Sequence, residues 1–235
     1  MGVYIENFQD SLPDPKKVKE IKKDLESKGV KYIYSNWIDF LGSPKTKPMP
    51  ISDFEDLCSG KGPQFAVHSV SFVPELTPAD NDQIPVPDLD SLVICPWDKT
   101  CAWVFADLWW NDKPYDVCPR QTLKKQIYKN AQADLKFYVG IEPEFFVMKW
   151  EDGKPVKAID NDPIPLRRQA FGYDAEYSID GMNFLKEIID ILNNDLHWDL
   201  HDVVAEGAYG QYELDFGYTD MLGMADRLVF LRVLL

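Results

Sequence analysis

Residues 135–147 alternate between apolar and polar side chains, and this period of two is the feature that most restricts how the chain can fold. Successive side chains of a strand point to opposite faces of a sheet, so the alternation predicts a strand with one core face. Five apolar residues form that face: Phe137, Val139, Ile141, Phe145 and Val147. The opposite face carries Glu142 and Glu144, whose charges repel each other unless a cation lies between them.

A hairpin predicted over residues 200–216 adds a second group of carboxylates. If Glu206 and Gln211 pair across its turn, then Glu213 and Asp215 point to the same face as that pair. The other face carries three residues expected in the core: Tyr212, Leu214 and Phe216. If the hairpin lies beside the first strand, four carboxylates surround one concavity: Glu142, Glu144, Glu206 and Glu213. Such oxygen ligands suit Mg²⁺ or Mn²⁺, with room for two or more ions per site.

The chain is acidic, with 39 Asp and Glu against 25 Lys and Arg, and a formal net charge of −14. This charge argues against a nucleic acid or an anionic membrane as partner, and it favours divalent cations and cationic amines. Both acidic features also have a simpler interpretation. An acidic surface keeps a protein soluble, and Glu142 and Glu144 could face solvent on an edge strand and so prevent pairing with other chains.

The first half of the chain predicts one helix followed by many short strands, which indicates an α+β fold. The helix is expected to begin after Asp14 as N-cap, with Pro15 in its first turn and Gly29 beyond its end. A second short helix is expected around residues 54–57, and residues 60–116 are rich in proline and aromatic residues. We therefore expect an N-terminal domain over residues 1–116.

The composition changes near Pro119, where a helix is predicted with Leu123, Ile127 and Ala131 on one face. A second domain is accordingly expected over residues 117–235, with further helices around residues 182–192 and from residue 219 onward. The last helix has an apolar stripe that runs to the final residue without a capping signal. We therefore expect the chain to be cut inside a larger domain.

The four cysteines form no Cys-x-x-Cys pair and are expected to be ordinary thiols: Cys58, Cys95, Cys101 and Cys118. No apolar run reaches the length of a membrane span, and the N-terminus lacks the basic and apolar parts of a signal peptide. These features lead us to expect a cytoplasmic protein that binds no membrane.

The two carboxylate motifs, in this order and about sixty residues apart, resemble the glutamine synthetase family. The first motif reads Gly-Ile-Glu-Pro-Glu-Phe-Phe over residues 140–146, and the second comprises Glu206, Gly210, Gln211 and Glu213. Segments of the first half, among them IDFLGSPKTKPMPI, PVPDLDSL and CPRQTLKKQI, also resemble that family. The resemblance therefore spans nearly the whole chain.

The resemblance implies an ATP-dependent ligase that joins the side-chain carboxylate of glutamate to ammonia or a small alkylamine. Carried over residue by residue, Glu144, Glu206 and Glu213 would hold one divalent ion, and Glu142 would help to hold a second. The cations would bridge ATP and glutamate while the γ-phosphoryl group passes to glutamate, and the amine would then attack the γ-glutamyl phosphate. The resemblance assigns no catalytic side chain within this chain.

The resemblance also implies an architecture. Residues 1–116 would form a small β-grasp domain, and residues 117–235 would begin a catalytic domain built as an antiparallel sheet with flanking helices. The active protein would be a ring-shaped homo-oligomer, a dodecamer, in which the β-grasp domain of one subunit and the catalytic domain of the next build each site. The family's later nucleotide-binding segment and last metal ligand have no counterpart before Leu235.

The loop over residues 62–72, which reads GPQFAVHSVSF, departs from the family's pattern. Ala66 stands where ammonia-using members carry an aspartate, so this loop is more similar to the branch that makes γ-glutamylmethylamide. His68 in the same loop could line the amine site, although a lone histidine in a loop is more often structural or exposed. His197 and His201 are expected to be surface or packing residues, and residues 151–178 match no motif.

A non-catalytic relative, kept as a structural or regulatory subunit, is the alternative to the enzyme. Four intact metal carboxylates favour the enzyme, whereas the lack of the later motifs favours the alternative.

Overall fold

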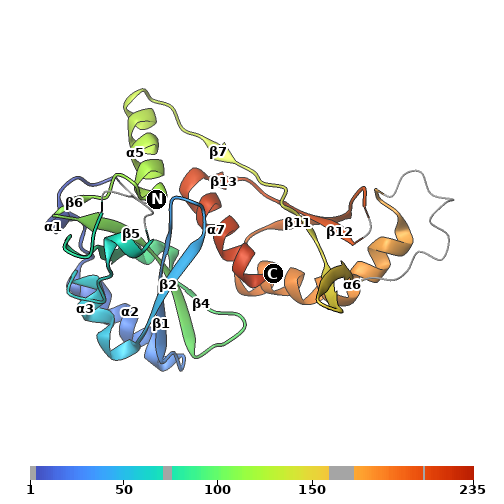
Figure 1. Ribbon diagram of the computed structural model, residues 1–235, viewed down its shortest axis with the longest axis horizontal. Coiled ribbons are helices and arrows are strands. Elements are labelled where there is room, and N and C mark those ends of the chain that lie inside the picture. Colours follow the sequence, from blue (N-terminus) through green and yellow to red (C-terminus); the bar gives the residue numbers. More distant parts are fainter. Residues whose placement is uncertain (1–3, 71–75, 159–171, 209) are drawn as a thin grey trace. The chain divides into compact units, whose positions relative to one another are not determined.

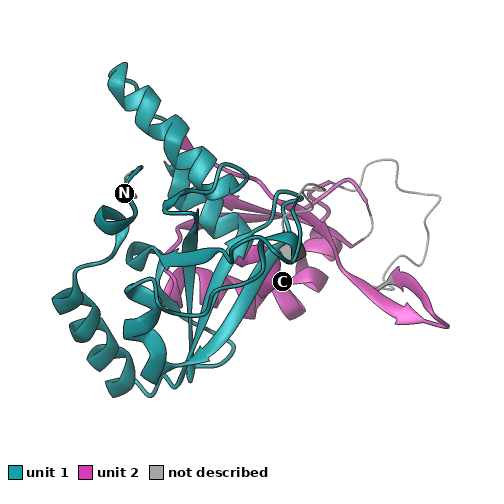
Figure 2. Ribbon diagram, turned by 60° about the vertical axis from the view of Figure 1, so that its left-hand side comes forward, with its two compact units in different colours: residues 1–137, 220–229 teal, residues 138–219, 230–235 magenta. Residues whose placement is uncertain are grey.

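The computed structural model describes residues 4–70, 76–158, 172–208 and 210–235 (Figure 1). It is a mixed α+β structure whose chain forms two compact units (Figure 2). The first unit comprises residues 1–137 and 220–229, and the second comprises residues 138–219 and 230–235. The domain boundary expected between residues 116 and 117 stays a prediction, because compact units need not coincide with domains of the sequence.

The first unit is built on a six-stranded sheet with the central order β2-β1-β5-β3. Its strands are β1 Tyr32–Ile38, β2 Pro44–Pro50, β3 Ile84–Pro87, β4 Val93–Ile94, β5 Cys101–Trp110 and β6 Lys113–Pro114. Strands β1 and β5 run parallel, and the other pairings are antiparallel. Strand β5 is buried over all but its last residue, as expected for a central strand covered on both faces.

Short helices surround this sheet: α1 Phe8–Ser11, α2 Pro15–Ser27, α3 Phe54–Cys58, α4 Val67–Val70 and α5 Pro119–Gln132. Single 3₁₀ turns lie at Ile51–Asp53 and Leu89–Ser91. Helix α2 begins as its sequence predicts, because the Asp14 side chain accepts a hydrogen bond from the Lys16 amide at 3.0 Å. Val18 and Leu25 of this helix pack with Phe54 of α3 in the core of the unit.

Helix α5 buries a charged face. Its buried residues are Arg120, Gln121 and Lys124, whereas Leu123 and Ile127 of the predicted apolar stripe are only half-buried and Ala131 is exposed. The apolar pattern therefore did not identify the face that is buried. The reason is a set of ion pairs with aspartates from distant parts of the sequence, which compensate the desolvation of the two cations.

The second unit contains a three-stranded antiparallel sheet, β11-β12-β8, and a separate hairpin of β9 and β10. Its strands are β7 Tyr138–Val139, β8 Glu144–Phe146, β9 Met148–Glu151, β10 Lys154–Lys157, β11 Leu200–Ala205, β12 Gln211–Phe216 and β13 Thr219–Asp220. The prediction of one continuous strand over residues 135–147 is wrong, because the strand is interrupted between β7 and β8, although the Pro143 and Ile141 carbonyls in this gap still accept hydrogen bonds from Leu214 and Phe216. Pro143 lies in this gap and has no amide hydrogen to donate to a neighbouring strand.

Helix α6 Ala175–Asp190, extended by a π-helical turn over Ile191–Asp195, packs against β12. Gly181 permits this approach: a Cβ atom there would lie 2.3 Å from Cε1 of Tyr212. The side chain of Leu185 is buried, as the helical pattern predicts. Part of the acidic loop over residues 151–178 lies outside the described residues.

Helix α7 Met221–Leu234 contributes its first nine residues to the first unit and its last turn to the second. Among the described residues, no helix combines the length and the apolar character that a membrane crossing needs. All four cysteines are free thiols, as expected.

Candidate metal centre

The carboxylates of the second unit are arranged by the strands β8 and β12. Glu144 and Glu213 lie directly opposite each other in the antiparallel pairing of these strands. Beyond the end of β11, the Glu206 amide donates to the Gln211 carbonyl at 3.0 Å, so these two residues pair across the turn as the sequence predicts. The alternation of β12 is also as predicted: three side chains are buried, namely Tyr212, Leu214 and Phe216.

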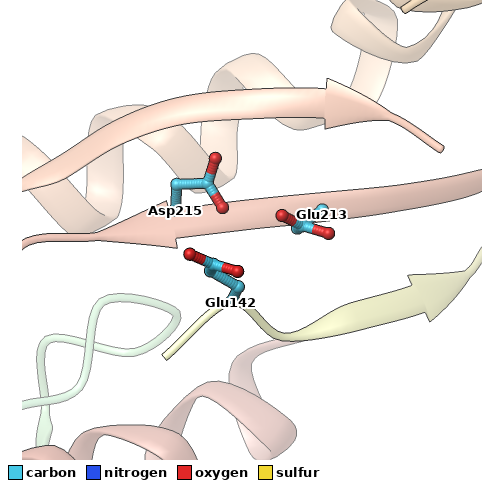
Figure 3. Close-up of side chains that lie close together, drawn as sticks. All are labelled: Glu142, Glu213 and Asp215. Atoms are coloured by element: carbon cyan, nitrogen blue, oxygen red, sulfur yellow. The ribbon is translucent and has the colours of Figure 1, made fainter. Parts of the chain in front are cut away.

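Two groups of three carboxylates form on the opposite face of β12. Glu144, Glu206 and Glu213 each offer an oxygen, and these oxygens lie within 4.8 Å of one another. Glu142, Glu213 and Asp215 form a second such group (Figure 3). Glu213 belongs to both, so the four glutamates expected to converge do lie around one strand. The role of these residues as metal ligands stays a prediction.

Asp215 is a member of the second group that the family resemblance does not assign. The strand alternation did place its side chain on the same face as Glu213. What the sequence alone could not supply was the position of Glu142 relative to Asp215, because this depends on the pairing of segments far apart in the chain.

Hydrogen bonds orient the glutamates of the first group. The Gln211 side-chain amide donates to Oε2 of Glu144 at 2.5 Å, and the Gly207 amide donates to Oε2 of Glu206 at 3.1 Å. Each bond leaves the second oxygen of its carboxylate open to another partner. Such neighbours fix the direction of a ligand before a metal binds.

The electrostatics of the site favour a bound cation. The pKa of Glu213 is raised to about 7. Desolvation is the largest cause, followed by a hydrogen bond with Asp215 and repulsion from it, and then by repulsion from Glu206 and Glu144. A divalent cation would reverse this effect, since it stabilises the ionised form of each carboxylate. The donors are all carboxylate oxygens, which are typical ligands of Mg²⁺ and Mn²⁺. The residues present therefore fit a site for hard divalent cations.

The histidines lie outside both carboxylate groups among the described residues. His68 lies in α4 of the first unit and is half-buried, and its proposed contact with an amine stays a prediction. His197 has a left-handed backbone, and its Nδ1 lies 3.0 Å from the Asn193 carbonyl oxygen. The exposed His201 has Nε2 at 3.5 Å from Asp199 Oδ2. These contacts are local, in agreement with the surface or packing roles expected for both.

A family model described as "Glutamine synthetase, catalytic domain" matches residues 116–235. Among curated proteins, a glutamine synthetase of Rhizobium meliloti is 33% identical over 205 residues, which cover 87% of this chain and 45% of the relative. A glutamate–methylamine ligase of Methyloversatilis universalis is 27% identical over 219 residues, covering 91% of this chain and 47% of the relative.

The structure is also similar to solved structures. One titled "Apo GmaS without ligand" has a TM-score of 0.79 and 28% sequence identity, and the match covers 91% of this chain and 48% of that one. One titled "GmaS/ADP complex-Conformation 1" has a TM-score of 0.78 at the same identity, with 90% and 47% covered. The chain thus spans about half the length of the proteins it matches.

Proposed function

This chain belongs to the glutamine synthetase family, and we propose that it supplies the metal-binding carboxylates of an ATP-dependent ligase. The ligase joins the side-chain carboxylate of glutamate to ammonia or a small alkylamine, and ATP is converted to ADP and phosphate. The observation that carries this proposal is the convergence of two carboxylate groups on Glu213. A solvated acidic surface does not require carboxylates directly opposite each other in paired strands, where like charges destabilise the sheet.

The chemistry is divided between the cations and the chain. When bound, two divalent cations neutralise charge on the transferring phosphoryl group and align ATP with glutamate. Glu144, Glu206 and Glu213 would hold one cation, and Glu142 would help to hold the other. Gln211 orients Glu144, and the buried side chains of β12 fix the strand in the sheet, so the ligands are mounted on a rigid element.

The first unit is proposed to be a β-grasp domain that completes the site of a neighbouring subunit in a ring-shaped homo-oligomer, a dodecamer. Its sheet, with α2 and α3 packed on one face and parallel central strands β1 and β5, supports this proposal. The catalytic domain is proposed to begin at residue 117. A cytoplasmic location stays a prediction.

The acceptor is proposed to be a small alkylamine as well as ammonia. One matched relative is a glutamate–methylamine ligase, and others are glutamine synthetases. Ala66 replaces the aspartate of ammonia-using members with a methyl group, so the site loses a charge that would hold ammonium and gains apolar surface. An alkyl group on the amine can bury itself against such a surface.

Isotope transfer tests the proposed reaction. The full-length protein is incubated with ATP, Mg²⁺, methylamine and glutamate that carries ¹⁸O in its side-chain carboxylate. Attack of a carboxylate oxygen on the γ-phosphorus, followed by attack of the amine on the acyl carbon, leaves one ¹⁸O in the released phosphate. Mass spectrometry is expected to show labelled phosphate and γ-glutamylmethylamide in equal amounts.

Two results of this experiment would contradict the proposal. Product with unlabelled phosphate would exclude a γ-glutamyl phosphate. No product with methylamine or ammonia, in a protein that still binds Mn²⁺, would favour the alternative of a non-catalytic relative.

A further inference from the structure

The segment around Ala66 is held against the sheet of the first unit by the residues on either side of it. The ring of Phe65 stacks on the ring of Trp37 in β1, with 4.0 Å between the ring centroids and 5° between the ring planes. On the other side of Ala66, the side chain of Val67 is fully buried. Phe65 packs against one apolar cluster, which comprises Trp37, Val67, Leu108, Tyr115 and Cys118. Residue 66 therefore lies between two packed side chains.

The backbone of the same segment is hydrogen-bonded on both sides of the sheet edge. The Phe65 amide donates to the Gln83 carbonyl at 3.2 Å, and the Gln83 amide donates to the Phe65 carbonyl at 2.8 Å. Gln83 directly precedes β3. Nζ of Lys47 in β2 donates to the Gln64 carbonyl at 2.5 Å. Because residues 64, 65 and 67 all have partners in the first unit, the fold of that unit sets the position of residue 66.

Trp37 contributes to this arrangement through packing alone. The residue is 4% exposed, and its Nε1 is buried without a hydrogen-bond partner among the described residues. A buried donor without an acceptor costs free energy, which the contacts of the ring must offset. Aromatic pairs prefer particular geometries, so a flat indole face restricts the orientation of the Phe65 ring more than an aliphatic side chain would.

We propose that Trp37 is a positioning residue for the amine acceptor, because its stack with Phe65 holds residue 66 in place. The inference rests on the proposed function, since the proposed role of Ala66 connects the stack with the amine. A gap of about 0.5 to 1 Å already removes a quarter to a half of the attraction between two atoms in contact. A shift of the segment therefore weakens the contact of the Ala66 methyl group with an alkyl group. Ammonia carries no alkyl group and is affected less.

Hydrogen exchange of the full-length protein tests the effect of the stack without measuring activity. The variant Trp37→Leu removes the stacking ring, and Trp37→Phe keeps an aromatic ring. The matched control is Trp109→Leu, because Trp109 is also buried in this sheet and its Nε1 has no hydrogen-bond partner among the described residues. Its ring contacts Phe8, and the alternation of β5 directs it away from Leu108 of the cluster.

Trp37→Leu is expected to accelerate exchange in peptides that cover residues 64–68 by about 10-fold, because the segment opens more often. Trp37→Phe and Trp109→Leu are expected to stay within about twofold of the wild-type protein. Unchanged exchange in Trp37→Leu would overturn the proposal. An equal acceleration in Trp109→Leu would also overturn it, since a general loss of stability would then explain the effect.

Amine kinetics of the same variants test the connection with the acceptor. Trp37→Leu is expected to raise the KM for methylamine about threefold or more and to leave the KM for glutamate within about twofold of wild type. The kcat/KM for methylamine relative to that for ammonia should fall by a similar factor, and Trp37→Phe should restore it. An unchanged ratio, with faster exchange in residues 64–68, would show that Trp37 is a core residue without a role in amine selection. A wild-type protein that uses neither amine would instead overturn the proposed function.

Phe65→Leu keeps the proposal testable if Trp37→Leu fails to fold. This variant removes the other ring of the same stack, at a position that is only partly buried. The same acceleration of exchange and the same fall in the methylamine-to-ammonia ratio are expected. Wild-type values for both quantities would overturn the role of the stack.

Discussion

Replacing Arg120 with methionine is expected to destabilise the first unit by about 3 to 5 kcal/mol, because it leaves buried carboxylates without their main cation. Arg120 is 5% exposed, and its guanidinium donates hydrogen bonds to three aspartates. Its bonds are 2.5 Å to Asp107, 2.8 Å to Asp88, and 3.0 and 2.9 Å to the two oxygens of Asp226. In the variant, Lys124 would still pair with Asp107 and Asp88, but Asp226 would lose its ion pair with Arg120.

The pKa shifts of the aspartates indicate how far Arg120 compensates the burial of each carboxylate. Burial raises the pKa of Asp226, and the charge and hydrogen bonds of Arg120 only partly offset this effect. Burial also acts on Asp88, but Arg120 and Lys124 outweigh it and lower its pKa. Asp88 therefore contributes stability above its unfolded pKa, and this contribution is lost as the pH falls through its folded pKa. Asp226 acts in the opposite direction and is a net cost at neutral pH. Adding Asp226→Asn to the Arg120→Met variant is accordingly expected to restore part of the loss.

Urea unfolding at neutral pH measures these effects, with Lys129→Met as the control, because Lys129 is an exposed cation on the same helix. The loss expected for Arg120→Met is a large share of the stability of an ordinary domain, which is about 5 to 15 kcal/mol. A loss below about 1 kcal/mol, or no recovery in the double variant, would show that the pairs contribute no more than surface salt bridges do.

Other predictions concern the second unit and the amine. Gly181→Ala is expected to destabilise the protein by about 1 to 3 kcal/mol in urea unfolding, since its Cβ would overlap the buried Tyr212 ring, whereas Gly172→Ala meets nothing within 4 Å and should be neutral. The pKa of Glu213 is raised to about 7, so protons compete with Mn²⁺ for this carboxylate below that pH. The Mn²⁺ affinity measured by calorimetry should therefore fall as the pH is lowered through about 7. An affinity that stays the same between about pH 8 and pH 6 would refute this prediction. Ala66→Asp is expected to raise the kcat/KM for ammonia relative to that for methylamine several-fold in a phosphate-release assay. An unchanged ratio would show that residue 66 does not contribute to the amine site.

The local patterns of the sequence predicted most of what lies within one element. The helix after Asp14, the alternation of β12 and the pairing of Glu206 with Gln211 all follow from residues close in the chain. The two motifs also sufficed to identify the family, which the match over residues 116–235 confirms. The sequence predicts such features because they depend only on residues that are close together in the chain.

The features that the sequence missed depend on distant partners. The buried face of α5 is charged because its aspartates come from near β3, from β5 and from α7, and a helical pattern carries no information about them. Similarly, the pairing of Asp215 with Glu142 depends on the register between segments about seventy residues apart. The burial of Arg120, and the proximity of Asp215 to Glu142, could therefore be recognised only from the fold.

One register sets both the core and the two carboxylate groups of the second unit. Tyr212, Leu214 and Phe216 are buried on one face of β12, and Glu213 and Asp215 lie on the other. A slip of β12 by one residue would exchange the two faces, so it would bury carboxylates and expose three large apolar side chains. The cost of that exchange holds Glu213 opposite Glu144, and the hydrogen bonds of Leu214 and Phe216 then set Asp215 opposite Glu142. The apolar face of β12 therefore keeps these carboxylates together even in the absence of a cation, at the cost of repulsion that a cation would remove.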